Sequence, residues 1–356
     1  MLLTGLSFIV VLGVVVFVHE FGHFIAARLM GARVEAFSIG FGKLFGVRRG
    51  ETEYRIGYIP LGGYVKISGM VDEFMEGDAG VKGEPWEFQS KSTLAKVFMI
   101  TAGVLMNFIA GFLLYSLVIF SEGEPRILPT PTVGNVAKGY PAEEIGLQPG
   151  DRILSVDGIA TGEWEPFRDY VQARPEQTIQ LVWLHGGDTL STAVVPKGVE
   201  VDRDGEKTTI GLIGIDQAYE HVPVGIGRSL VVGGETTWDI ISLSLKSVGM
   251  LITGKASVKD LTGPAGIIYL SGETVRAGWV TFIAFIALIN ISIGLLNILP
   301  FPVLDGGHLV YILIEAIIRR PISTKVKLAL QQVGLALLLV LVVVVTYHDI
   351  LRFFVS

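Results

Sequence analysis

The sequence contains no cysteine, so neither disulfide bonds nor thiolate metal ligands are available to it. Charged residues make up only 17%, whereas half of the residues are hydrophobic; soluble domains carry roughly 25% charge. The formal net charge is −6, and without a basic stripe nucleic acid is excluded as a partner. Any metal site must draw on carboxylates and on six histidines: His19, His23, His185, His221, His308 and His348.

Long apolar runs are what the sequence has in abundance. A membrane-spanning helix needs about 20 apolar residues. Four stretches reach that length, namely Leu3–Ala27, Val97–Phe120, Trp279–Leu304 and Leu328–Tyr347. A weaker stretch, Ile240–Thr253, is interrupted by Lys246 and is predicted to lie at the lipid interface as an amphipathic helix. The sequence thus predicts a polytopic α-helical membrane protein with four transmembrane helices in the lipid bilayer.

Lysine and arginine lie close to the span ends in the first and last connections between these stretches. They include Arg28, Arg33, Lys43, Arg48, Arg49, Lys82, Lys91 and Lys96 in the first connection, and Arg319, Arg320, Lys325 and Lys327 in the last. Because cytoplasmic loops are enriched in basic residues, both connections are predicted to be cytoplasmic. Both termini and residues 121–278 are then extracytoplasmic.

The first apolar stretch carries the motif His19-Glu20-Phe21-Gly22-His23. Residues four apart lie on one face of a helix, so both imidazoles can bind one Zn²⁺ while Glu20 acts on the attacking water. The alternative is a signal peptide followed by an ordinary helix. No basic residue precedes the apolar run and no Ala-x-Ala site precedes the motif, which disfavours a signal peptide.

A catalytic zinc site needs a third protein ligand and one open position. Residues 297–308, at the end of the third stretch, read NILPFPVLDGGH, and span parity puts them on the same membrane side as the histidine motif. Pro300 and Pro302 break a helix there, which is tolerated only where protein or water receives the freed backbone groups. Asp305 is the predicted third ligand. His308 is its rival, and simple helix capping is the alternative role for Asp305.

Three motifs occur in a characteristic order: HEFGH at 19–23, GYIPLGGYVKI at 57–67 and NILPFPVLDGG at 297–307. Together they resemble the site-2 protease family of intramembrane zinc metalloproteases, and most closely its bacterial members that regulate the sigma-E response. The resemblance covers essentially the whole chain. It implies a zinc metalloendopeptidase of the bacterial cytoplasmic membrane that cleaves transmembrane proteins, such as anti-sigma factors or signal-peptide remnants.

The same resemblance assigns roles to individual residues. His19, His23 and Asp305 would hold Zn²⁺, and Glu20 would act as general base and then as general acid. The site would lie toward the cytoplasmic side of the membrane, where water can reach it. Asn297 matches an asparagine that the family places near the active site and associates with substrate handling.

A helical substrate must be unwound before its peptide bonds can be attacked, and an edge strand can hold the unwound chain by main-chain hydrogen bonds. Short β-type runs lie between Phe37 and Met70. The resemblance implies that Gly57–Ile67 forms a membrane-reentrant β-element beside the zinc. The predicted substrate-binding residues in it are Gly62, Gly63, Tyr64 and Val65. The alternative is an ordinary cytoplasmic hairpin.

Other asparagines in the apolar spans need a reason to be there, because polar side chains are costly in lipid. Asn107 lies in the second span, where Val104 stands at a position that is often proline in the family. For Asn107 a functional role and a hydrogen bond between helices remain equally open. Asn290 and Ser292 are predicted to be packing residues.

Residues 125–220 read as one compact domain that resembles a PDZ domain in the permuted bacterial arrangement. The predicted strands alternate with a helix at Glu163–Ala173, and the strand Ile210–Ile215 would border a peptide groove beside that helix. Strand addition in this groove would capture peptides, including peptide C-termini. A second reading makes the domain a bulky shield that filters substrates by size. The family members it resembles carry two such domains, and only one fits here.

The predicted organisation therefore has four parts. Residues 1–120 hold two spans and the HExxH motif, and residues 125–220 form the PDZ domain. Residues 221–278 are an interfacial connector with a helix at Arg228–Ile252 and a loop at Thr262–Gly266, and residues 279–356 hold the last two spans. A metal transporter and a PDZ adaptor with a vestigial site are the competing functions. A transporter would need ligands at mid-membrane on several helices, whereas the ligands predicted here lie together at one depth in the membrane. An adaptor with a vestigial site would have a damaged motif, whereas HExxH is intact.

Overall fold

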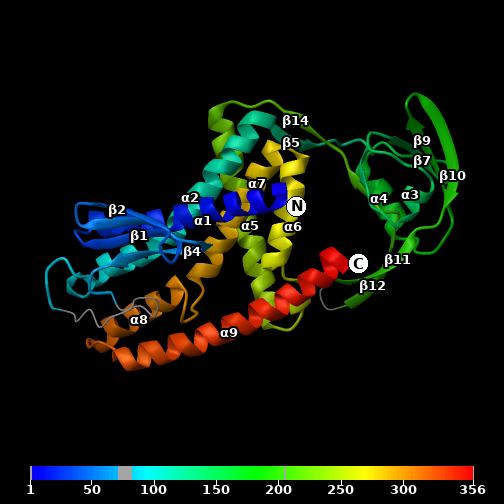
Figure 1. Cartoon of the computed structure of the whole chain (residues 1–356). Helices are drawn as coiled ribbons and strands as arrows, with labels where there is room; N and C mark the ends of the chain where they lie inside the picture. The colour runs from blue at the N-terminus through cyan, green and yellow to red at the C-terminus, as the bar shows by residue number, and fades with distance from the viewer. Residues whose placement is uncertain (1, 71–81, 204–205, 356) are drawn as a thin grey trace. The chain divides into compact units, whose positions relative to one another are not determined.

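The computed structural model describes residues 2–70, 82–203 and 206–355. It contains two compact units, one formed by residues 1–121 and 225–356 and the other by residues 122–224. Helices dominate the first unit and strands dominate the second (Figure 1).

Four helical segments of the first unit are long and apolar enough to cross a membrane, as the sequence predicted. They are α1 (Leu2–Leu29), α2 (Thr93–Glu122), α7 (Trp279–Ile298) and Thr324–Phe354, which comprises α9 (Thr324–Ile350) and part of the π-helical segment Leu351–Val355. The predicted third span was too long at its end. Helix α7 stops at Ile298, because Pro300 and Pro302 cannot donate to the helical ladder.

Three further helices complete the first unit: α5 (Ile226–Ile252), α6 (Pro264–Ala277) and α8 (Asp305–Ile318). Short 3-10 turns lie at Phe88–Ser90 and Val258–Asp260. The helix predicted at Arg228–Ile252 is α5. The loop predicted at Thr262–Gly266 was wrong in its second half, because Pro264 begins α6 at a position where a missing N–H costs nothing.

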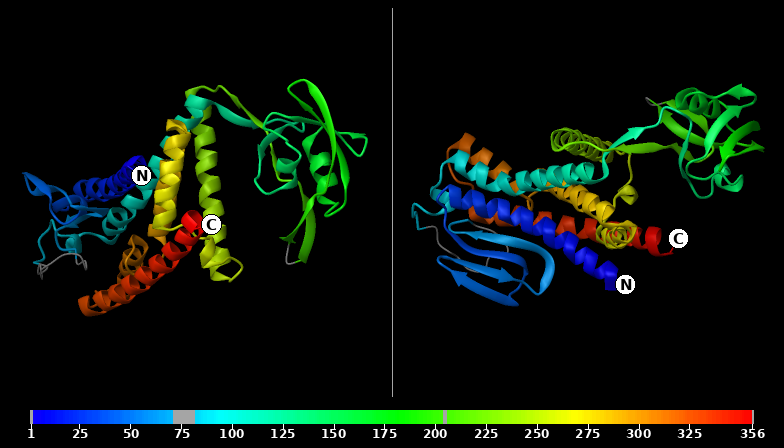
Figure 2. Two further views of the ribbon diagram at one scale, coloured as in Figure 1. Left: turned by 45° about the vertical axis from the view of Figure 1, so that its right-hand side comes forward. Right: turned by 90° about the horizontal axis from the view of Figure 1, so that it is seen from above.

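A four-stranded sheet follows α1 in the chain. Its strands are β1 (Val34–Phe41), β2 (Phe45–Arg49), β3 (Thr52–Ile56) and β4 (Ile59–Ile67), in the order β2-β3-β1-β4. Strand β1 pairs parallel with β3 and antiparallel with β4. Among the described strands, β4 therefore has one paired edge and one outer edge. The sheet lies alongside α1, and β4 packs against that helix (Figure 2).

Close helix packing holds the zinc-motif end of α1 in place. Val11 and Val15 of α1 are fully buried against Phe285 and Ile286 of α7. Helix α1 also approaches α2 so closely that a Cβ on Gly22 would lie 2.4 Å from the backbone oxygen of Ala102. Small residues permit such approaches, and van der Waals packing is what holds helices together in lipid.

The second unit is a set of small sheets with two short helices, α3 (Pro141–Glu144) and α4 (Trp164–Gln172). One sheet has the order β10-β9-β7-β8. The other pairs are β11 with β12, β13 with β6, and β14 with β5. The strands are β5 (Glu124–Ile127), β6 (Val133–Val136), β7 (Arg152–Val156), β8 (Ile159–Ala160), β9 (Ile179–His185), β10 (Asp188–Val194), β11 (Lys197–Arg203), β12 (Glu206–Leu212), β13 (Ile215–Gln217) and β14 (Tyr219–Val222).

The core of the second unit lies between α4 and these strands. Phe167 of α4 is 2% exposed and packs with Ile153, Ile179 and Leu181, which are fully buried. The helix predicted at Glu163–Ala173 is α4. Burying such side chains stabilises the fold by about 1.5–3 kcal/mol each.

One predicted strand of this unit was wrong in its continuity. Residues Ile210–Ile215 are divided between β12 and β13, because Gly214 has a φ of 86° and interrupts the extended backbone. The sequence analysis also missed the long hairpin of β11 and β12.

Candidate metal centre and substrate cavity

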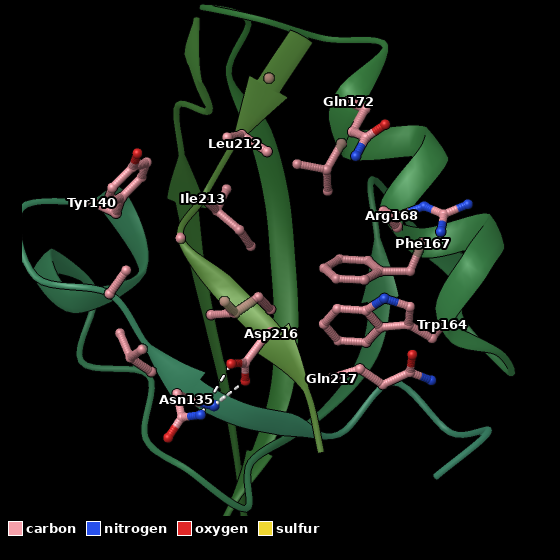
Figure 3. Close-up of a pocket in the computed structure, with 16 residues that line it drawn as sticks. Asn135, Tyr140, Trp164, Phe167, Arg168, Gln172, Leu212, Ile213, Asp216 and Gln217 are labelled. Atoms are coloured by element: carbon pink, nitrogen blue, oxygen red, sulfur yellow. Dashed lines mark hydrogen bonds between the residues drawn. The ribbon is translucent and has the colours of Figure 1, made fainter. Parts of the chain in front are cut away.

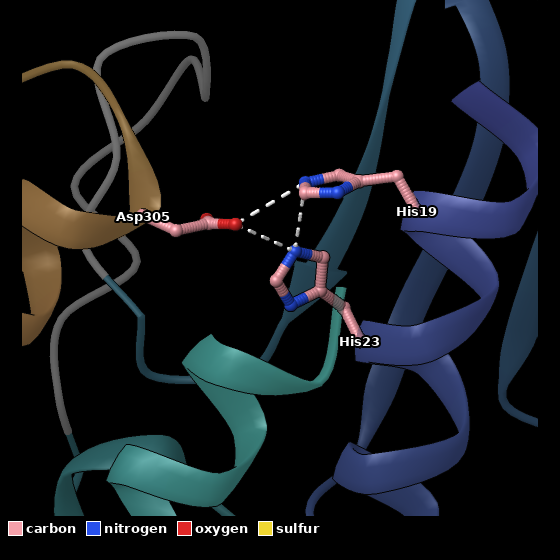
Figure 4. A group of neighbouring side chains, drawn as sticks. All are labelled: His19, His23 and Asp305. Carbon is pink, nitrogen blue, oxygen red and sulfur yellow. Dashed lines mark hydrogen bonds and ion pairs between the residues drawn. The ribbon is translucent and has the colours of Figure 1, made fainter. Parts of the chain in front are cut away.

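Three side chains from two distant parts of the chain meet at one point in the first unit. His19 and His23 project from α1 and Asp305 from the first turn of α8 (Figure 4). His19 Nε2 lies 3.2 Å from Asp305 Oδ2, His23 Nε2 lies 3.3 Å from the same oxygen, and the two Nε2 atoms are 3.2 Å apart. The structure thus brings the three predicted ligands together.

The spacing of these atoms fits one zinc ion. Ligands about 2.0–2.1 Å from a tetrahedral metal are separated from each other by about 3.3–3.4 Å, and the observed triangle has sides of 3.2–3.3 Å. Asp305 Oδ2 is buried without a hydrogen-bond partner among the described residues. The two imidazole nitrogens are close to it but make no hydrogen bond of normal angle with it, as expected when all three atoms direct lone pairs at a shared cation.

The tautomer of His23 is fixed by the neighbouring helix. Its Nδ1 lies 2.8 Å from the carbonyl oxygen of Met99 on α2. A carbonyl only accepts, so Nδ1 carries the proton and Nε2 presents a lone pair toward Asp305. Gly103, one turn along α2, makes room for the ring, since a Cβ there would lie 2.3 Å from His23 Nε2.

Two asparagine amides reach the other histidine. Asn107 Nδ2 lies 3.2 Å from His19 Nδ1, and Asn297 Nδ2 lies 3.4 Å from His19 Nε2. Asn297, predicted from the sequence as a substrate-binding residue, therefore reaches the metal-facing side of the cluster. Asn290 instead donates to Ile286 O of its own helix at 2.8 Å, which is the packing role predicted for it.

A cavity of about 170 Å³ opens beside the cluster. Glu20 lines it and is only 9% exposed. His308, the rival ligand, also lines this cavity, but its Nε2 lies 3.4 Å from Gln331 Nε2, and the group of convergent ligand atoms contains Asp305 and not His308. The other residues of the wall include Phe41, Ile67, Met70, Ile100 and Val303.

Strand β4 forms one wall of the cavity. Gly63, Tyr64 and Val65 line it, whereas Gly62 adopts a φ of 106° beside the ring of Phe41. A Cβ on Gly63 would lie 3.0 Å from Glu20 Cγ and 2.6 Å from the backbone oxygen of Ser38. The strand thus passes directly beside Glu20, and three of the four predicted β-residues border the same space as the metal cluster.

The turn that delivers Asp305 depends on two glycines that follow it. A Cβ on Gly306 would lie 2.1 Å from Leu299 O, and one on Gly307 would lie 2.2 Å from Phe301 O. The proline-containing segment before α8 therefore folds tightly over the start of that helix. Sequence reasoning had named Asp305 but had not assigned this packing role to the two glycines.

The second unit has a larger groove of about 530 Å³ (Figure 3). It lies between α4 and residues 211–217, and Trp164, Phe167 and Ile213 form its apolar wall. Strand β13 pairs with β6 on its other side. No histidine lines this groove, and Arg168 on its rim is paired with Asp169 at 2.8 Å.

Comparison with known proteins identifies the family of this chain. The model of peptidase family M50 matches residues 7–341. A provisionally named zinc metalloprotease of Agrobacterium fabrum is 35% identical over 365 residues, which cover 98% of this chain and 96% of that protein. A similarly named protein of Clostridium acetobutylicum is 34% identical over 343 residues, 96% of each chain. The zinc metalloprotease RasP of Oceanobacillus iheyensis is 29% identical over 426 residues, 99% of each.

Among solved structures, the PDZ domain of the SdrC-like protein from Listeria monocytogenes is similar to part of this chain. The sequence identity is 25% and the TM-score 0.20, with 25% of this chain and 88% of that domain covered. The full-length relatives are the stronger evidence, because they span almost the entire chain and bear zinc metalloprotease names. The chain is a zinc metalloprotease that belongs to peptidase family M50, the site-2 proteases.

Proposed function

We propose that His19, His23 and Asp305 hold the catalytic Zn²⁺ and that the enzyme hydrolyses peptide bonds within transmembrane segments. The observation that carries this proposal is the triangle of ligand atoms with sides of 3.2–3.3 Å. Two of its corners come from α1, a candidate membrane span. The third comes from α8, the helix that follows the candidate span α7. Such a site is suited to substrates that reach it from the bilayer.

Glu20 is the group that moves protons in this proposal. Zinc, when bound, lowers the pKa of a coordinated water to about 7 and polarises the scissile carbonyl. The Glu20 carboxylate accepts a proton from the attacking water and then donates it to the amide nitrogen that leaves. The small, walled cavity keeps bulk water away from the reacting groups, which strengthens each electrostatic interaction there.

Strand β4 and Asn297 are the proposed substrate holders. An unwound substrate can add to the outer edge of β4 as a further strand, with main-chain hydrogen bonds that do not depend on its sequence. Gly63 has no side chain, so β4 itself passes close to Val16 and Glu20 of α1 and holds its edge beside the proposed site. The Asn297 amide, 3.4 Å from His19 Nε2, is placed to donate to a substrate carbonyl beside the metal.

The proposed setting is the bacterial cytoplasmic membrane. The basic residues between α1 and α2 and between α8 and α9 would face the cytoplasm. The metal centre then lies toward the cytoplasmic side, β4 reenters the membrane there, and both termini and the PDZ domain are extracytoplasmic. Anti-sigma factors and signal-peptide remnants are the physiological substrates that the family resemblance suggests.

For the PDZ domain we favour peptide capture over a purely steric role. The groove of about 530 Å³ beside α4 and the exposed edge of β13 would accept an extended peptide, including a C-terminus. Deleting Thr132–Ile215 with a short flexible join tests this. Loss of cleavage for both long and trimmed substrates supports capture, whereas new cleavage of bulky substrates alone supports a size filter.

The proposed chemistry is tested by Glu20→Gln in the full-length protein reconstituted in lipid. Zinc content is measured together with cleavage of a transmembrane peptide. The variant keeps one zinc per chain but loses cleavage, because an amide cannot shuttle the proton. Near wild-type cleavage by Glu20→Gln, or a wild-type protein that binds no zinc, would overturn the proposal.

A further inference from the structure

Asn107 is a fully buried carboxamide in the middle of the apolar helix α2. Its Nδ2 lies 3.2 Å from His19 Nδ1. Its Oδ1 has no hydrogen-bond partner among the described residues. The contact with His19 is thus the one hydrogen-bond contact of this side chain among the described residues.

The protonation of His19 decides which amide atom belongs beside it. His19 Nε2 faces Asp305 and His23 at 3.2 Å each, so Nε2 is the nitrogen available to a metal. A neutral imidazole that ligates through Nε2 carries its proton on Nδ1. The Nδ1–H group then needs an acceptor, and the Asn107 amide lies within hydrogen-bond distance of it, at 3.2 Å.

A half-turn of the amide about its terminal bond exchanges the positions of Nδ2 and Oδ1. With Nδ2 toward Nδ1–H, two donors would face each other while the acceptor stays unused. With Oδ1 toward Nδ1–H, the same side chain supplies the acceptor that the ligand requires. Metal binding at His19 therefore selects the second orientation.

We infer that Asn107 is a positioning residue for the metal centre, whose Oδ1 accepts the Nδ1–H of His19 and fixes both its tautomer and its ring orientation. The inference rests on the proposed zinc site and deepens it. Outer-shell acceptors of this kind are typical partners of metal-binding histidines. Through His19, Asn107 would set zinc affinity without contacting substrate.

The placement of the two orienting groups on α2 supports this inference. Met99 O accepts from His23 Nδ1 at 2.8 Å, and Asn107 lies eight residues further along the same helix. Eight residues are about two helical turns, so both groups share one face of α2. His19 and His23 share one face of α1, and the antiparallel helix α2 thus offers one acceptor to each imidazole.

The chain contains a matched control. Asn290 of α7 is also fully buried in an apolar span, and its Oδ1 likewise has no hydrogen-bond partner among the described residues. Its Nδ2 donates to Ile286 O within its own helix. Replacing either asparagine by leucine removes a carboxamide of the same burial, but only Asn107 adjoins a proposed ligand.

The test measures zinc affinity by competition with a chromophoric chelator and the visible absorption of the Co²⁺-substituted full-length protein. Asn107→Leu should bind zinc about 10–100-fold more weakly and shift the Co²⁺ bands. Asn107→Asp keeps an acceptor and should retain affinity within a few-fold. Asn290→Leu should match the wild type in both measurements.

The outcomes separate this inference from the proposed zinc site. A wild-type protein that binds no zinc removes both. Wild-type zinc binding with an unchanged Asn107→Leu variant, or an equal loss in Asn290→Leu, overturns the role of Asn107 alone. If Asn107→Leu does not fold, Asn107→Asp decides: a tenfold loss of zinc affinity in that variant contradicts the inference.

Discussion

Two hollows of this protein, one in each unit, differ in size and in chemistry. The cavity beside the metal cluster has a volume of about 170 Å³ and is walled by His19, His23, Asp305 and Glu20 among others. The groove of the second unit has about 530 Å³ and is lined mainly by apolar side chains and backbone. The smaller hollow is lined by three histidines, two carboxylates and strand β4. The larger one is lined by no histidine, and aromatic and aliphatic side chains form much of its wall.

A second contrast concerns histidine–aspartate pairs. In the second unit, His185 Nδ1 lies 2.7 Å from Asp151 Oδ1, and the other oxygen of Asp151 accepts from Gln148 N at 2.9 Å. That carboxylate is satisfied by donors. Asp305 Oδ2 faces two imidazoles without a normal hydrogen bond. Proximity of histidine and aspartate is therefore not enough to indicate a metal site; the proposed site also has an aspartate oxygen, Asp305 Oδ2, without a hydrogen-bond partner among the described residues.

Replacing Asp305 and Asp151 each by alanine tests whether the two histidine–aspartate pairs differ in function, and the largest effect is expected here. Asp305→Ala should weaken zinc binding by more than about 100-fold and abolish cleavage, because it removes a ligand. Asp151→Ala should leave zinc stoichiometry unchanged and destabilise only the second unit. Zinc content and thermal unfolding of both variants are the measurements. Full zinc affinity in Asp305→Ala would show that the two pairs are alike.

A smaller loss of zinc affinity is expected when a side chain is added where α2 contacts α1. Gly103→Ala would place a Cβ 2.3 Å from His23 Nε2 and displace the ring from its bond to Met99, so zinc affinity should fall about 10–100-fold. Gly13→Ala is the control, because a Cβ there meets nothing within 4 Å. Chelator competition measures both variants, and equal affinities would contradict the packing argument.

A substitution in the core of the second unit should lower the free energy of unfolding of that unit without changing zinc binding. Phe167→Ala removes a ring that is 2% exposed and should cost about 3–5 kcal/mol of the free energy of unfolding of that unit. Zinc content should remain that of the wild type. Chemical denaturation followed by tryptophan fluorescence, with zinc release measured in parallel, checks both. Simultaneous loss of zinc would mean that the two units unfold as one.

The smallest expected effect is a pH dependence in the second unit. The backbone N–H of Gln180 and the hydroxyl of Tyr170 donate to Asp157 and lower the pKa of its carboxyl group. The stabilisation is present above the unfolded-state pKa of about 3.9 and is lost as pH falls through the lower folded-state pKa.

Asp157→Asn removes this titration. Between about pH 5 and 3 the wild-type unit should lose more stability than the variant, as measured by denaturation at each pH. Asparagine tolerates the φ of 47° at this position, so the variant is a fair control. If the stabilities of the two proteins change with pH in the same way, Asp157 does not contribute to the pH dependence.

Periodicity and motif spacing were enough to predict the four candidate spans and the clustering of His19, His23 and Asp305. The four-residue spacing of His19 and His23 requires only a helix. Pro300 and Pro302 interrupt the helix before Asp305. The freed backbone groups need protein or water as partners, so this segment is expected to line a polar site. These local rules are strong because lipid forbids unsatisfied backbone groups.

The sequence could not predict features that depend on contacts between distant segments. The role of Asn107 stayed open, because the sequence does not show that its amide lies beside His19 Nδ1. The first residues of helix α6 were read as part of a loop, although Asp349 accepts from the backbone N–H groups of Gly263 and Gly266 at 3.0 and 2.8 Å and anchors the start of the helix. The hairpin of β11 and β12 was missed because its strands carry several charged residues and few apolar ones.

X-ray absorption at the zinc edge reads out the proposed metal ligands themselves. The full-length protein should hold one zinc per chain with two imidazole nitrogens at about 2.0–2.1 Å and carboxylate oxygen at about 2.0–2.2 Å. In His23→Ala the imidazole signal should fall by half or the metal should be lost. Zinc with a single imidazole in the wild type, or a spectrum that His23→Ala leaves unchanged, would contradict the assignment.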